Sequence, residues 1–264
     1  MQDGFKTMES SLDNLFAAAT FSDRGLVRKD NQDAVLSVPA RGFFAVADGM
    51  GGGEGGALAS KWTCEELAKA VEPAAGSAPA SSPVALDKIK AALETAHSRI
   101  ARYAAQLNYR SMGTTVALVA AADGVSARVL WVGDSRVYRL REGEVERLTD
   151  DHTLGFELSR AVAGSETAKA VSARRHPLAH VLTHAIGVDR KLEPETREID
   201  LRPGDRFLVC TDGVHDLLEP EDLKRTLAAA DVEAATAATA ALVRERGAHD
   251  NFSMVCFELR RARQ

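Results

Sequence analysis

Four aspartates stand beside apolar segments, where a β-sheet would bring their carboxylates together. Asp48, Asp134 and Asp212 each follow a run of apolar residues typical of a buried strand. Asp250 instead precedes such a run, at 252–259. In an antiparallel sheet the end of one strand lies beside the start of its neighbour. We therefore expect the four carboxylates to gather at one edge of the sheets.

Clustered carboxylates predict a site for divalent cations, because close carboxylates raise each other's pKa unless positive charge neutralises them. The ligands are hard oxygens, which suit Mg²⁺ or Mn²⁺ rather than zinc or copper. Gly49 lets the chain turn after Asp48 and leaves a carbonyl available as a further ligand. Two such cations and a bridging water hydrolyse phosphoesters. Asp and Gly are also common turn residues, so spacing alone leaves a metal site and ordinary turns as alternatives.

Composition narrows the class of protein. The chain has 264 residues, of which 45% are hydrophobic and 27% charged, as in soluble globular proteins. A net charge of −5 and only 5% aromatic residues argue against nucleic-acid binding, which needs clustered basic charge or stacking platforms. No apolar stretch could span a bilayer and no signal peptide is evident. Three scattered cysteines without a CxxC pair indicate a reducing compartment. We expect a cytoplasmic protein.

The elements that position these residues are short strands and four long helices. We predict strands at 34–38, 42–47, 114–121, 127–132, 137–141, 197–200, 206–210 and 252–259, and helices at 57–71, 84–107, 219–230 and 232–247. The strands come in meandering runs rather than in alternation with helices. This pattern predicts an α+β fold with antiparallel sheets. Residues 1–20 are assigned to a leader, and 21–264 to a single domain.

The resemblance to a known family rests on a series of motifs in one order. These are DRGLVRKDNQDA at 23–34, VADGMGG at 46–52, MGTT at 112–115, VGDSR at 132–136, LTDDH at 148–152, HP at 176–177, LTHAIG at 182–187, TDG at 211–213 and HDNFS at 249–253. Together they resemble the metal-dependent protein phosphatases of the PPM or PP2C family, in its bacterial form. The resemblance implies two stacked antiparallel sheets with helices packed outside each.

The resemblance also implies a role for each matching residue. Asp48 matches the carboxylate that bridges two metal ions, Gly49 the backbone carbonyl ligand, and Asp212 and Asp250 further ligands. Asp33 matches an acid that holds metal-bound water. Arg28 matches the arginine that holds the substrate phosphate, for which its fixed fork of donors is suited. Asp134, with Asp212, matches a weaker third metal site. The implied cofactors are thus two, and in bacterial members up to three, Mn²⁺ or Mg²⁺ ions.

The implied reaction is hydrolysis of phosphoserine and phosphothreonine in proteins by direct attack of water. The partners would be phosphorylated proteins, such as a Ser/Thr kinase or its substrates, and the protein would be a monomer. The segment 154–175 matches the flap beside the active site. We expect this flap to be irregular, and its Arg174 and Arg175 to be a solvated pair rather than a contact for acidic peptides.

The sequence departs from the family pattern near the site. Gln32 stands where Glu is usual, Gly53 where bacterial members have a histidine linked to proton donation, and Ala57 where Glu is usual. His180 and His184 replace Asn and Arg beside the flap. The loss at position 53 leaves the general acid unassigned, with metal-bound water or His249 as substitutes. These departures keep a second hypothesis open, a pseudophosphatase or regulatory binding module on the same fold.

Other patterns have ordinary explanations. Gly51, Gly53 and Gly56 fit the G-x-G-x-x-G pattern of dinucleotide-binding enzymes, but the preceding strand ends in Asp48, which would repel a pyrophosphate. His176, His180 and His184 recur at a helical spacing that could bind zinc, yet Pro177 makes one continuous helix unlikely. Ser135 is interpreted as a turn hydroxyl and Arg136 as a structural ion-pair partner.

Overall fold

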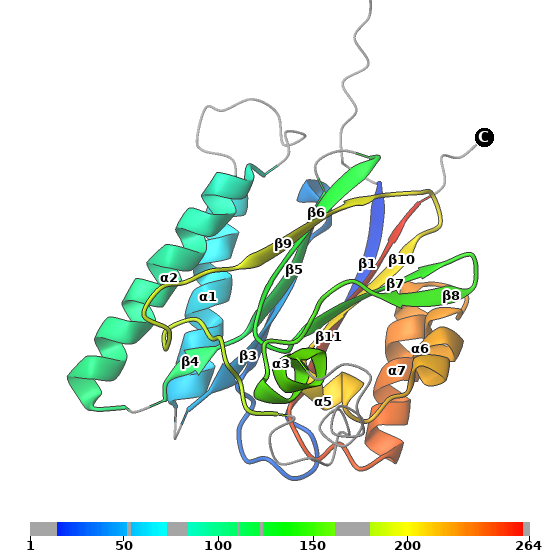
Figure 1. The fold of residues 1–264 in the computed structure, drawn as a ribbon. Helices are drawn as coiled ribbons and strands as arrows, with labels where there is room; N and C mark the ends of the chain where they lie inside the picture. The colour runs from blue at the N-terminus through cyan, green and yellow to red at the C-terminus, as the bar shows by residue number, and fades with distance from the viewer. Residues whose placement is uncertain are drawn as a thin grey trace, which may run out of the picture.

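A computed structural model describes residues 15–51, 54–72, 84–109, 111–121, 124–161 and 180–260. Two β-sheets are stacked at its centre (Figure 1). The first sheet has the order β1 (Phe16–Asp23), β11 (Phe252–Leu259), β10 (Arg206–Cys210), β7 (Arg136–Arg141) and β8 (Glu144–Arg147). The second has the order β2 (Asp33–Val38), β3 (Phe43–Met50), β5 (Val116–Ala121), β6 (Ser126–Val132) and β9 (Glu195–Asp200), and β4 (Gly113–Thr114) pairs with β3. Neighbouring strands are antiparallel throughout.

Helices cover the outer face of each sheet (Figure 1). The second sheet is covered by α1 (Gly55–Val71) and α2 (Leu86–Leu107), and the first by α6 (Pro220–Leu227) and α7 (Val232–Glu245). Within the described residues, short helices also occur in connections: η1 (Pro39–Arg41), α3 (Leu154–Ala161) and α5 (Asp212–His215). The predicted α+β class, with two antiparallel sheets between helices, is confirmed.

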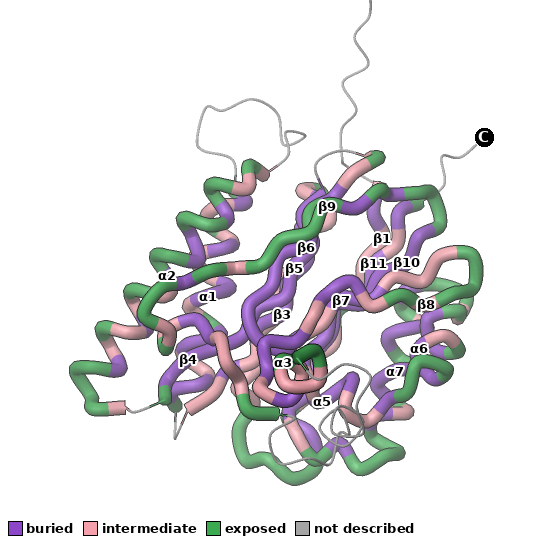
Figure 2. Tube along the Cα trace, viewed as in Figure 1, coloured by how far each residue is buried: buried purple, intermediate pink, exposed green. Residues whose placement is uncertain are grey.

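Apolar residues fill three layers, one between the sheets and one under each pair of helices. Buried positions run along the central strands (Figure 2). Between the sheets, the ring of Phe257 stacks on Phe44 at 3.8 Å and on Phe207 at 4.8 Å, measured between ring centroids. All three rings are fully buried. Aromatic stacking of this kind adds to the large hydrophobic contribution of each ring. This layer holds the two sheets, and hence the loops at their common edge, in a fixed relation.

The structure corrects the predicted leader boundary and the predicted flap. Residues 16–20, assigned to the leader, begin β1, which pairs with β11 from Phe16 opposite Leu259 to Asp23 opposite Phe252. The run Phe-Ala-Ala-Ala carries a weak strand signal, because alanine favours helices, and pairing with β11 overrides that preference. The first part of the predicted irregular flap, 154–161, is the helix α3. Residues 162–175 lie outside the described residues. The strand β8 was also missed.

Candidate metal centre

The strand registers bring the acidic residues to one edge of the two sheets. In the first sheet, Cys210 of β10 lies opposite both Met254 of β11 and Arg136 of β7. The acidic residues lie within a few residues of these strand ends. Asp212 follows β10, Asp250 precedes β11, and Asp134 precedes β7. In the second sheet, β2 and β3 are paired so that Asp33 lies opposite Asp48. Asp48 lies inside β3 rather than after its end, because the strand continues to Met50.

A pocket of about 260 Å³ opens at this edge. Its wall contains the four predicted metal-binding aspartates, the predicted carbonyl ligand and the predicted phosphate-binding arginine. The lining residues are Arg28, Gln32, Asp48, Gly49, Met50, Gly51, Thr115, Asp134, His180, Leu182, Asp212, Asp250 and Asn251. Asp33 lies beside the pocket, close enough for Asp212 and Asp250 to raise its pKa. The structure thus brings all seven predicted site residues together.

The pocket gathers more acidic than basic side chains. Burial, and then the neighbouring carboxylates, raise the pKa values of Asp48 and Asp134 far above the ordinary value. Burial also raises the pKa of Asp212, which shares a hydrogen bond with Asp48. Two carboxyl groups can share such a bond only if one of them is protonated. A divalent cation between them would remove both the repulsion and the need for that proton.

The pKa of Asp33 is raised in the same way. Burial, with the charges of Asp212 and Asp250, raises its pKa to about 7 against hydrogen bonds from Ser253 and Thr211. Thr211 Oγ1 donates to Asp33 Oδ2 at 2.9 Å. Within the described residues, the Oδ1 atoms of Asp33 and Asp212 are buried and make no hydrogen bond. Buried oxygens of this kind are unusual, and they point to an ion or water that completes the site.

The chemical types of these residues suit a divalent cation, although their side chains do not form a complete set of ligands. The donors are carboxylates and backbone carbonyls, as Mg²⁺ and Mn²⁺ prefer. Across the described part of the chain, however, no three acidic, histidine or cysteine side chains already form a ligand cluster. The carboxylates that line the pocket supply the hard oxygen donors that such a cation requires.

Arg28 lies at the rim of the pocket. Its Nη2 donates to Asp250 Oδ2 at 2.6 Å, and its side chain is 57% exposed. Charges of Asp250, Asp212 and Asp48 all favour the guanidinium form. The arginine is therefore exposed to an incoming anion and anchored to the wall of the pocket. This placement agrees with its predicted role as the phosphate-binding group.

Glycines allow the backbone to come close together behind the site. A Cβ on Gly49 would lie 2.1 Å from the carbonyl oxygen of Gly56 and 2.5 Å from that of Gln32. The Gly49 amide also donates to the Gln32 carbonyl at 3.1 Å. Gly49 and Gly56 therefore let β3 pack against the start of α1, a role that requires no dinucleotide. Gly53 lies outside the described residues.

The wall beyond Asp134 is held by a buried ion pair. Arg136 donates to Asp151 through Nε at 2.8 Å and through Nη2 at 2.5 Å. The two side chains are only 16% and 10% exposed. The interpretation of Arg136 as a structural partner is confirmed. The Ser135 hydroxyl lies 2.7 Å from that of Thr115 and is buried, which agrees with a structural turn hydroxyl.

The sequence analysis missed the contribution of one histidine to the pocket. His180 lines it, whereas His184 packs against His152 at 4.9 Å between ring centroids. His176, the third residue of the considered zinc pattern, lies outside the described residues. His180 contacts Asp216 at 3.3 Å, a long-range contact that sequence spacing does not reveal. The only available signal was the departure from the family residue at position 180.

The described helices include none that is both long and apolar enough to cross a membrane.

The three cysteines are buried and unpaired. Burial raises the pKa values of the Cys64 and Cys256 thiols to about 12 and that of the Cys210 thiol further. Thiols in this state are poor nucleophiles, so their chemistry is not that of the site.

Comparisons with known proteins agree with this geometry. The serine/threonine protein phosphatase PstP of Mycobacterium tuberculosis is 32% identical over 238 residues, which cover 90% of this chain and 44% of PstP. The chain therefore spans less than half the length of that relative. Among solved structures, PppA, described as a key regulatory component of T6SS in Pseudomonas aeruginosa, superposes with a TM-score of 0.80 and 33% identity, over 93% of this chain and 98% of PppA.

The catalytic domain of PstP has been solved in complex with two manganese ions. It superposes with a TM-score of 0.78 and 30% identity, over 93% of this chain and 99% of that domain. The family model described as protein phosphatase 2C matches residues 22–250. This range includes every acidic residue of the pocket. The chain belongs to the protein phosphatase 2C family.

Proposed function

We propose that this protein hydrolyses phosphoserine and phosphothreonine in proteins, using two Mn²⁺ or Mg²⁺ ions. The observation that carries the proposal is the set of buried carboxylates with raised pKa values around one pocket, with Arg28 at its rim. Family membership and the two manganese ions of the PstP catalytic domain support it. Perturbed carboxylates that gather in a pocket are typical of functional sites.

In this proposal Asp48 lies between the two cations, and Asp212, Asp250 and the Gly49 carbonyl complete their protein ligands. When bound, the cations would activate a bridging water and neutralise charge that develops on the phosphoryl group. Asp134, which lines the same pocket, would hold a third cation together with Asp212. None of these side chains needs to act as a nucleophile, so the reaction proceeds without a phosphoenzyme.

Two residues of this chain would act directly on the substrate and the water. Arg28 binds the phosphate oxygens, since its guanidinium offers paired donors and is already directed at the pocket. Asp33 has a buried Oδ1 without a hydrogen bond among the described residues, and it would accept one from the attacking water. The accepted bond would hold a lone pair of the water toward phosphorus.

The proposed partners are phosphorylated proteins, among them a Ser/Thr kinase or its substrates. The protein would act as a monomer in the cytoplasm, where its buried thiols stay reduced. The regulatory-module alternative is not favoured, because every predicted acidic ligand is present and lines or adjoins the pocket. Gln32 and Gly53 are then changes that tune the rate.

The test is hydrolysis of a phosphothreonine peptide and of p-nitrophenyl phosphate by the purified protein, with Mn²⁺ titrated against an EDTA blank. Asp212→Asn is the test variant. Asp87→Asn, an exposed residue in the first turn of α2, is the matched control. We expect metal-dependent turnover in the wild type and the control, and its loss in Asp212→Asn. No turnover by folded protein at millimolar Mn²⁺ would overturn the proposal.

A further inference from the structure

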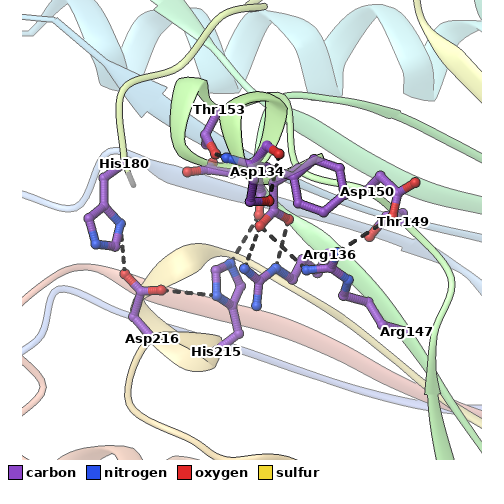
Figure 3. Close-up of polar contacts among 12 residues, drawn as sticks. Asp134, Arg136, Arg147, Thr149, Asp150, Thr153, His180, His215 and Asp216 are labelled. Carbon is purple, nitrogen blue, oxygen red and sulfur yellow. Dashed lines mark hydrogen bonds and ion pairs between the residues drawn. The ribbon is translucent and has the colours of Figure 1, made fainter. Parts of the chain in front are cut away.

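Three side chains form a continuous line from the buried wall of the pocket to its rim (Figure 3). His215 Nε2 lies 3.0 Å from the backbone carbonyl oxygen of Asp134. His215 Nδ1 lies 3.2 Å from Asp216 Oδ1, and Asp216 Oδ2 lies 3.3 Å from His180 Nδ1. The side chain of His215 is 2% exposed, whereas that of His180 is 48% exposed. The line therefore runs from a fixed interior to an accessible imidazole.

The contacts of Asp216 hold the rim histidine in place. Asp216 lies between two imidazoles, and although burial acts to raise its pKa, the hydrogen bond and charge of His215 and the charge of His180 lower it. It is therefore a carboxylate, which only accepts hydrogen bonds. The Nδ1 atom of His180 lies 3.3 Å from Asp216 Oδ2, an ion-pair contact when the ring is protonated. This contact orients the ring and places its second nitrogen, Nε2, on the edge opposite Asp216.

The proposed reaction needs a proton at the leaving oxygen. A serine or threonine oxygen leaves poorly as an alkoxide, so a group in the pocket must protonate it. Arg28 does not release its proton at accessible pH. The carboxylates that line the pocket are assigned to cations, and Asp33 beside it is assigned to the attacking water. Among the described residues that line the pocket, His180 is the one histidine. His249 is exposed and does not belong to that lining.

We propose that His180 is the general acid of the proposed phosphatase reaction, and that Asp216 and His215 are the residues that position it. The inference rests on the proposed function. As water attacks phosphorus, the bond between phosphorus and the ester oxygen breaks and its electron pair stays on that oxygen. His180 transfers the Nε2 proton to it and releases the serine or threonine hydroxyl. The attacking water keeps one proton in the phosphate product and loses the other to solvent, and His180 regains from solvent the proton that it gave.

The charged groups around His180 suit this role. His215, the last residue of α5, and Asp216, which follows it, lie behind His180. The opposite side of the pocket carries acidic and basic side chains. The groups there are Arg28, Asp48, Asp134, Asp212 and Asp250. Cations held by those carboxylates would reduce their negative field at the imidazole. Asp216 would then be the carboxylate in contact with the imidazole, and that contact is independent of metal.

The test compares two leaving groups in the same enzyme. The p-nitrophenolate anion is stable and leaves without a proton, whereas the threonine oxygen of a phosphopeptide needs one. We expect His180→Gln to lower kcat on the peptide about 100-fold or more, the scale of general acid catalysis, and to leave kcat on p-nitrophenyl phosphate nearly unchanged. Asp216→Asn should give a smaller loss with the same preference.

The contrary results distinguish failure of the role of His180 from failure of the proposed phosphatase function. An equal loss on both substrates would show that His180 binds phosphate or supports the fold, and would overturn the inference. So would an unchanged peptide rate in His180→Gln, or a loss confined to the peptide in His249→Gln instead. In those cases the wild type still hydrolyses both substrates and the proposed function stands. If the wild type hydrolyses neither, the proposed function itself fails, and this inference with it.

Discussion

The strongest quantitative expectation concerns Asp33, whose buried carboxyl should make the metal-free protein less stable as pH rises. Its pKa is raised from 3.8 to about 7, chiefly by burial and then by Asp212 and Asp250. The folded state therefore holds this proton more tightly than the unfolded chain does. Between pH 4 and 7 the unfolding free energy should fall, by about 4 kcal/mol from three pKa units at 1.4 kcal/mol each. Domains of this kind have only about 5–15 kcal/mol in total.

Asp33→Asn removes the ionising group and keeps a similar shape. We expect the metal-free variant to be about 2–4 kcal/mol more stable than the wild type at pH 8, because relaxation around the charge reduces the full penalty, and nearly equal to it at pH 4.5. Saturating Mn²⁺ at pH 8 should restore the stability of the wild type, since binding to the folded state alone stabilises it. Stability and hydrolysis should thus change in opposite directions in this variant.

The assay is urea unfolding followed by circular dichroism, in EDTA and in Mn²⁺, at several pH values. Asp87→Asn is the control, because it makes the same chemical change at an exposed position, with an effect of about 0.5 kcal/mol from the helix dipole. The reasoning is refuted if wild type and Asp33→Asn lose stability equally between pH 5 and 8 in EDTA. It is also refuted if Asp33→Asn is the less stable protein at pH 8.

Three further substitutions test other parts of the account. Arg28→Ala should lower kcat/KM on the phosphopeptide roughly 10- to 100-fold, which is the scale of a lost charged hydrogen bond. The affinity for Mn²⁺ should change little. An unchanged kcat/KM would show that Arg28 does not bind the phosphate. Arg136→Met leaves Asp151 buried without its main partner and should cost about 3–5 kcal/mol in urea unfolding, most of it recovered when Asp151→Leu is added. No recovery in the double variant would contradict that cause. Phe257→Ala should cost about 3–5 kcal/mol through the cavity between the sheets, and folded protein at low temperature should still hydrolyse phosphopeptide.

The sequence predicted the acidic cluster because its signal is local. Each of Asp48, Asp134 and Asp212 sits at or near the end of an apolar run, and antiparallel pairing then fixes where such ends meet. The β1 strand escaped detection because its alanines favour a helix and only pairing with β11 makes it a strand.

The contacts from His215 through Asp216 to His180 could not be predicted from the sequence for a different reason. Asp216 and His180 are far apart in sequence, and their contact exists only after β7, β10 and the loop at 180–187 are in place. A histidine in a loop carries no periodic or spacing signal that separates it from an ordinary exposed residue. Raised pKa values were likewise foreseeable in direction from clustered acids, but burial, their largest cause, required the structure.

The central claim is that the clustered carboxylates hold the cations that drive hydrolysis. The most direct measurement records bound Mn²⁺ per chain and phosphate release from a phosphothreonine peptide in one titration, for the wild type and for Asp48→Asn. We expect the rate to rise together with occupancy by two ions, and both to be lost in folded Asp48→Asn. Full turnover by metal-free, chelated protein, or unchanged occupancy and rate in Asp48→Asn, would contradict the account.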